Sequence, residues 1–154
     1  MRAEPPADVD REHIAEVCQV ETWPELTLPD QLPGLVYDTP EYNAYRAVQE
    51  ELIGSSGSTH HRLLGHPQVV QNAMELECQL VTNGIYCGSP EGYECDERKT
   101  LEAGAADWRL LLQIDSDDEP GWMWGDVGRI YFWIKQQDLA LRCFDNVWLI
   151  FQCS

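Results

Sequence analysis

Basic residues are scarce in this sequence. Its 10 Lys and Arg residues stand against 27 Asp and Glu residues, which gives a formal net charge of −17 at pH 7. A chain of this charge is repelled by the phosphates of DNA and RNA and by anionic lipid headgroups. We therefore expect no nucleic-acid partner and no membrane-surface partner. A basic protein is the partner class that the charge favours.

Long apolar runs are also missing. No stretch approaches the roughly 18 apolar residues that a membrane-spanning helix requires. The first residues are acidic and contain Pro5 and Pro6, unlike the apolar centre of a secretion signal. These features predict a cytoplasmic protein. The 6 cysteines include no C-x-x-C pair, so we expect reduced thiols and neither a redox motif nor a zinc knuckle.

Familiar catalytic motifs are absent as well. The sequence contains no G-x-S-x-G, no H-E-x-x-H, no Walker loop and no G-x-G-x-x-G. These patterns supply an activated serine, a zinc-bound water or a cradle for phosphates. No catalytic residue and no cofactor is predicted on this basis, and the sequence leans away from an enzyme.

What the sequence does contain is enough apolar material for a hydrophobic core, 44% of its residues. Its distribution divides the chain into three parts. Residues 1–38 are acidic and proline-rich, and we expect them to be largely irregular. Residues 39–58 combine an amphipathic helix over 40–53, with Thr39 as its N-cap, and a Ser/Gly linker. Residues 59–154 hold the core and form the main domain.

Three short runs in the last part are rich in β-forming residues. They predict strands over 108–114, 129–134 and 146–153. The first run suits a strand that is buried on both faces. The last run is so apolar that we expect a central position in the sheet, since an exposed edge strand of this kind promotes aggregation.

Two further segments are less regular. Residues 69–83 fit a strand by alternation and a helix by composition, and we favour the helix because Asn83 and Gly84 suit a left-handed C-cap. Residues 86–107 are interrupted by glycine and proline and predict a loop. The expected fold class is α+β, with a mainly antiparallel sheet and a few flanking helices.

Three histidines lie close together at His60, His61 and His66. Histidine clusters can bind zinc or nickel. No carboxylate or thiolate stands at ligand spacing beside them, so we favour a structural role within a turn.

Carboxylates gather after the first predicted strand. Asp115 and Asp117 are similar to the start of a calcium loop, but Pro120 stands where that loop needs glycine and Asp126 where it needs glutamate. An EF-hand is therefore excluded. A looser cation site made from Asp115, Asp117 and Asp126 remains an alternative to a solvated acidic loop, which we favour.

Aromatic residues border the same loop. Trp122 and Trp124 lie on one side of an extended segment, which makes them the best candidates for exposed aromatic contacts. The residues that we expect to contact a partner or ligand are Asp115, Asp117, Asp118, Glu119, Trp122, Trp124, Asp126 and His61.

Several longer motifs resemble a known family. They are H-x-L-L-G-H-P-x-x-x-Q from His61, M-E-L-E-C-Q-L-V-x-N-G-x-Y-C-G from Met74, D-W-R-L-L-L-Q-I-D-S-D from Asp107, W-G-D-V-G-R-I-Y-F-W-I from Trp124 and D-L-A-x-R-x-F-D-x-V-W-L-I-x-Q-C from Asp138. In this order they are similar to the C-terminal half of the YwqG-like family of bacterial proteins of unknown function. The resemblance implies an α+β protein with extensive antiparallel sheet and brings no established reaction.

Members of that family are typically longer, with further strands in an N-terminal half. The resemblance therefore implies either a shortened member or a homo-oligomer in which another copy completes the C-terminal sheet. Some similar proteins occur in toxin–immunity settings, where an acidic binder would neutralise a basic toxin.

Two functional hypotheses follow. The first is a non-enzymatic, acidic protein-binding module, immunity-like in its mode of action. The alternative is a metal- or small-ligand-binding domain, or an enzyme of unknown reaction, that uses two clusters: His60 and His61, and Asp115, Asp117 and Asp126.

Overall fold

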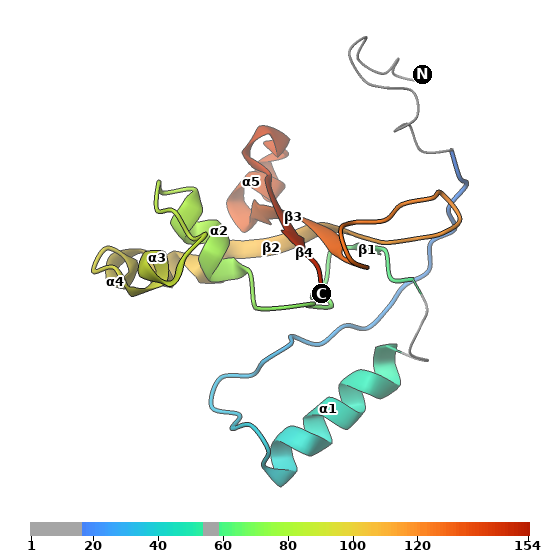
Figure 1. The fold of residues 1–154 in the computed structure, drawn as a ribbon, viewed down its shortest axis with the longest axis horizontal. Helices are drawn as coiled ribbons and strands as arrows, with labels where there is room; N and C mark the ends of the chain where they lie inside the picture. The colour runs from blue at the N-terminus through green and yellow to red at the C-terminus, as the bar shows by residue number, and fades with distance from the viewer. Residues whose placement is uncertain (1–16, 54–58) are drawn as a thin grey trace.

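The computed structural model describes residues 17–53 and 59–154 (Figure 1). Its elements run in the order α1 (Pro40–Ile53), β1 (Arg62–Leu63), α2 (Glu75–Val81), α3 (Pro90–Glu94), α4 (Arg98–Leu101), η2 (Glu102–Asp107), β2 (Trp108–Asp115), β3 (Arg129–Lys135), α5 (Gln136–Leu141), η3 (Phe144–Asn146) and β4 (Trp148–Gln152). The expected Ser/Gly linker, residues 54–58, lies outside the described residues. So do residues 1–16 of the expected irregular segment, whereas residues 17–38 contain no helix or strand.

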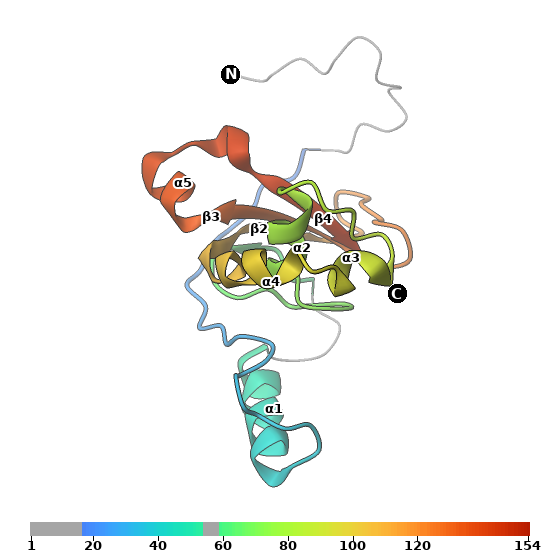
Figure 2. The same ribbon diagram turned by 90° about the vertical axis from the view of Figure 1, so that its left-hand side faces the viewer.

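The four strands form one sheet in the order β1-β2-β3-β4, and each neighbouring pair is antiparallel. Helices flank this sheet, and α1 lies to one side of it in both views (Figure 1, Figure 2). The α+β fold class with an antiparallel sheet is therefore confirmed.

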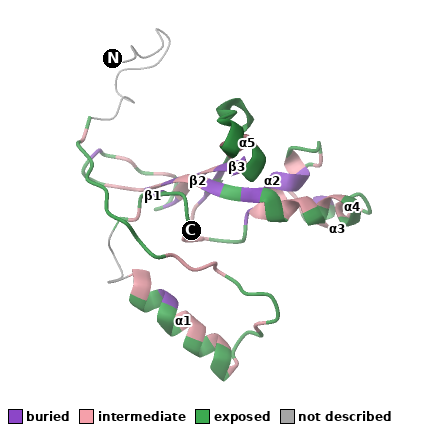
Figure 3. Cartoon of the chain, turned by 180° about the vertical axis from the view of Figure 1, so that it is seen from behind, coloured by how far each residue is buried: buried purple, intermediate pink, exposed green. Residues whose placement is uncertain are grey.

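The hydrophobic core lies between α2 and one face of the sheet. Its buried members come from α2 and the segment before it and from β2, β3 and β4: Met74, Cys78, Trp108, Leu110, Tyr131, Trp133 and Ile150. Figure 3 shows this burial along the strands beside α2. Burial on both faces of β2 was a wrong prediction, because its side chains alternate and Arg109 on the second face is exposed.

The central position predicted for the last strand is also wrong. β4 pairs with β3 at the edge of the sheet. Trp148 keeps 39% of its surface exposed, and Leu149 and Phe151 each keep 47%. An apolar run shows that a strand gains by burial, but it carries no information about how many strands lie beside it.

The loop predicted over 86–107 is a third correction. The structure places α3, α4 and η2 there. Pro90 begins α3 directly after Ser89, at the first helical position, where a missing N–H costs nothing. The helix favoured over 69–83 is confirmed only for Glu75–Val81. After it, Gly84 adopts the left-handed conformation with φ +87°.

Helix α1 has the predicted limits and the predicted cap. The Tyr42 N–H donates to Thr39 Oγ1 at 3.2 Å, which satisfies one of the free amides of the first turn.

Replacing Thr39 by alanine should cost about 1 kcal/mol of local helix stability. The equilibrium constant for local unfolding of the first turn should therefore rise about fivefold. Hydrogen exchange of the α1 amides measures it. Thr39→Ser keeps the hydroxyl, so equal exchange in both variants would contradict a capping role.

Candidate functional site

The loop between β2 and β3 and the residues before β1 meet at one end of the sheet. β1 pairs with β2 so that Arg62 lies opposite Gln113. The residue before it, His61, is therefore carried to the end of β2, beside Asp115 and Asp117. Two segments that are more than 50 positions apart thus form one cluster.

His61 joins the two segments through both ring nitrogens. Its Nδ1 accepts a hydrogen bond from the Asp115 N–H at 3.1 Å. An amide can only donate, so Nδ1 carries no proton in this arrangement and the proton resides on Nε2. Nε2 then donates to Asp117 Oδ2 at 3.0 Å. This hydrogen bond, with one from the Glu119 N–H, lowers the pKa of the Asp117 carboxyl.

The loop itself is folded onto its own main chain. Asp117 and Trp122 exchange two main-chain hydrogen bonds of 2.8 Å. The Trp124 N–H donates to Ser116 Oγ at 3.0 Å, and the Trp124 indole donates to the Asp115 carbonyl at 3.1 Å. These bonds fix the path of the loop.

The two tryptophans pack within the cluster. The ring of Trp122 meets the ring of His61 edge-on at 5.9 Å and lies 6.0 Å from the ring of Trp124. Both tryptophans are half-buried rather than fully exposed. They therefore present one side to solvent and use the other to hold the loop.

The outer side of the loop displays acids and apolar residues. We define the outer loop surface as five exposed residues: Asp118, Glu119, Met123, Asp126 and Val127. Met123 is 58% and Val127 61% exposed. Val127 has φ +50°, a left-handed conformation that a β-branched residue rarely adopts. The loop thus holds two apolar side chains in water among three carboxylates.

Asp115 has a different position from its acidic neighbours. It is 5% exposed. Its Oδ1 lies 2.8 Å from Nε of Arg129, and its Oδ2 accepts the His60 N–H at 3.0 Å. This carboxylate is therefore directed into the protein and does not belong to the outer loop surface. For His60, burial and the nearby Arg129 lower the pKa of its ring.

The cation site considered for Asp115, Asp117 and Asp126 is not formed. Within residues 17–53 and 59–154, no group of three or more His, Cys, Asp or Glu side chains is arranged to hold a metal ion. The carboxylates of Asp115 and Asp117 accept hydrogen bonds from the protein, as described above. The metal version of the alternative hypothesis therefore has no geometric support in the described part of the chain.

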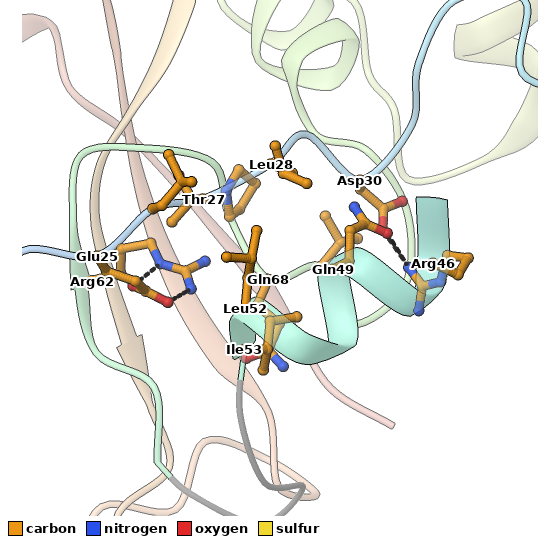
Figure 4. Close-up of a pocket in the computed structure, with 13 residues that line it drawn as sticks. Glu25, Thr27, Leu28, Asp30, Arg46, Gln49, Leu52, Ile53, Arg62 and Gln68 are labelled. Carbon is orange, nitrogen blue, oxygen red and sulfur yellow. Dashed lines mark hydrogen bonds and ion pairs between the residues drawn. The ribbon is translucent and has the colours of Figure 1, made fainter. Parts of the chain in front are cut away.

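A second feature was not predicted from the sequence. A cavity of about 140 Å³ lies between α1, residues 25–30 and residues 67–69 (Figure 4). Glu25 and Arg62 face each other across two contacts, Nε to Oε2 at 2.9 Å and Nη2 to Oε1 at 2.6 Å. We call this pair the Glu25–Arg62 clasp. No local pattern could reveal it, because its members are 37 positions apart.

Several other polar groups of the cavity are also paired within the chain, whereas the buried Gln68 Oε1 has no hydrogen-bond partner among the described residues. Tyr45 and Gln49 of α1 both donate to the Pro29 carbonyl at 2.6 Å. Arg46 lies 3.5 Å from Asp30. These contacts attach α1 to residues 29–30, and the Glu25–Arg62 clasp attaches the same stretch of chain to β1. The charged groups of the cavity are already neutralised by each other, which leaves little unpaired charge for a ligand.

Together, these features define an α+β domain with a four-stranded antiparallel sheet, flanking helices and an acidic inter-strand loop. Residues 4–153 match the family model described as "Domain of unknown function (DUF1963)". The chain belongs to this family. No curated protein shows a significant match to it. None of the described helices has both the length and the apolar character needed to cross a membrane.

Proposed function

We propose that this chain is a non-enzymatic, cytoplasmic protein-binding module that holds a basic protein against its outer loop surface. Its net charge of −17 favours a partner of the opposite sign. The finer form of the proposal is an immunity-like role, in which the partner is a basic toxin. That form rests on the resemblance to YwqG-like bacterial proteins.

The observation that carries the proposal is the combination of a fixed loop with an exposed acidic and apolar surface. Met123 and Val127 are exposed between carboxylates, while hydrogen bonds hold the loop main chain. A surface that is already ordered loses less entropy on binding than a mobile one. A loop that exposes both apolar and charged side chains also has the residue types of binding sites, which combine an apolar centre with a polar rim.

The strain at Val127 supports the same interpretation. A left-handed conformation at such a residue costs about 1–3 kcal/mol and is maintained only where the surrounding structure requires it. Here it turns the Val127 side chain into solvent, where the folded chain gains nothing from it. A partner that covers this side chain would remove its apolar surface from water and so provide a favourable free energy that offsets the strain.

The first part of the test identifies the partner. The immobilised chain is exposed to an extract of its source cells at about 50 mM and at about 500 mM salt, since screening weakens exposed charge pairs at the higher concentration. We expect a basic protein that is retained only at low salt and is identified by mass spectrometry. Retention of no basic protein at low salt would contradict the proposal.

The second part locates the contact with the purified partner. Asp118→Lys combined with Glu119→Lys should slow association by at least about tenfold, because electrostatic attraction acts mainly on the association rate. The matched control is Glu50→Lys combined with Glu51→Lys, the same change of charge on the exposed side of α1. We expect less than about a threefold effect from it. Equal effects of the two pairs would show that only the total charge matters.

A further inference from the structure

Within the described residues, the outer edge of β4 is an unpaired and uncharged edge of the sheet. Among the described strands, β4 pairs with β3 alone. In an edge strand, alternate main-chain N–H and C=O groups point away from the sheet and can pair with another strand. Proteins usually protect such an edge with a charged residue, a proline or a bulge.

β4 has none of these protections. Its sequence, WLIFQ, contains no charged residue and no proline. Its register with β3 is continuous from Trp148 to Gln152, without a bulge. Leu149 and Phe151 lie on the same face of the strand, and each is 47% exposed. The strand therefore offers hydrogen-bonding groups and apolar side chains together.

Charge indicates which molecule covers this edge. Two copies of a chain with net charge −17 repel each other over most of their surfaces. β4 is neutral along all 5 residues, so a second copy meets the least repulsion there. A basic partner gains no charge attraction from a neutral strand and is attracted to the acidic loop instead. The edge therefore suits another copy of the same chain.

We propose that two copies of this chain pair edge to edge through β4 and form one continuous antiparallel sheet. A twofold axis makes the strand complementary to itself. Full overlap of the two strands places Ile150 on the axis and Leu149 opposite Phe151 of the second copy. The Leu149–Phe151 and Ile150–Ile150 pairs are apolar, and Trp148 lies opposite Gln152. Each main-chain hydrogen bond across the axis is formed twice.

Light scattering after size exclusion tests this proposal on the full chain. The wild type should have twice the chain mass of 17.6 kDa. Leu149→Lys should return it to 17.6 kDa, because it replaces the apolar Leu149–Phe151 pair by an ammonium group opposite an aromatic ring on each side of the axis. Leu63→Lys is the matched control, since Leu63 is 71% exposed on β1 at the opposite edge of the sheet. It should keep the double mass.

The register has its own test. Leu149→Lys combined with Phe151→Glu places opposite charges face to face across the axis and should restore the double mass. Should Leu149→Lys not fold, hydrogen exchange of the wild type replaces it, and the β4 amides should become more protected as protein concentration rises. A wild-type mass of 17.6 kDa with exchange independent of concentration overturns the proposal. So does a Leu149→Lys protein of double mass, a Leu63→Lys protein of single mass, or a double variant that stays single.

Discussion

Replacing Asp115 by alanine should lower the free energy of unfolding by about 3–5 kcal/mol, a large share of the roughly 5–15 kcal/mol that holds a typical domain. Asp115 and Arg129 lie opposite each other in the register of β2 and β3. Their side chains are 7% and 16% exposed. Alanine leaves the guanidinium without its counter-charge and leaves the His60 and Ser116 amides without their acceptor.

Urea unfolding followed by tryptophan fluorescence measures this loss. Asp126→Ala is the control, because it removes an equal charge from an exposed position of the same loop. It should change the free energy of unfolding by less than about 0.5 kcal/mol. Equal unfolding midpoints for the two variants would contradict a buried ion pair.

Replacing Gly128 by alanine should cost about 1–3 kcal/mol. A Cβ at this position would overlap two main-chain oxygens, those of Gln152 in β4 and Trp124 in the loop. Main-chain atoms cannot rotate away as a side chain can, so the loop or the strand must shift. The shift would also disturb the Gly128 N–H, which donates to the Trp124 carbonyl at 2.7 Å.

Gly88→Ala is the matched control for this substitution. Its Cβ would meet only the side chain of Tyr86, which is exposed and free to move aside. Where the native conformation is compatible, Gly to Ala stabilises by about 0.4–1 kcal/mol through the unfolded state. The midpoint of urea unfolding should therefore fall for Gly128→Ala and rise for Gly88→Ala. A Gly128→Ala protein as stable as the wild type would show that the loop is not held this closely against β4.

The elements that sequence predicted correctly are those with local signals. Helix α1 begins after a Thr39 cap and a proline at the first helical position, and both act within a few residues. β2 and β3 are continuous runs of β-forming residues. The helices between 86 and 107 escape such a prediction, because Gly88, Pro90 and Gly92 indicate a loop although Ser89 and Pro90 also form a helix start.

The position of β4 and the geometry of the loop depend on distant partners. The acidic residues of the loop are evident from the sequence. The sequence does not show, however, that Arg129 on the neighbouring strand neutralises the Asp115 carboxylate. Nor does the spacing of His61 and Asp117, 56 positions apart, show that their side chains will meet. Such contacts follow from the register of the sheet, which composition and periodicity leave open.

The Glu25–Arg62 clasp determines where a segment of this chain must begin if it is to fold in another protein. The Arg62 side chain is 7% exposed and faces a carboxylate from a stretch with no helix or strand of its own. A copy that began at the first strand would bury a lone cation, which is far costlier than burying a pair. A segment exchanged with a relative, or grafted into another protein, must therefore begin at or before Glu25 and carry that counter-ion with it.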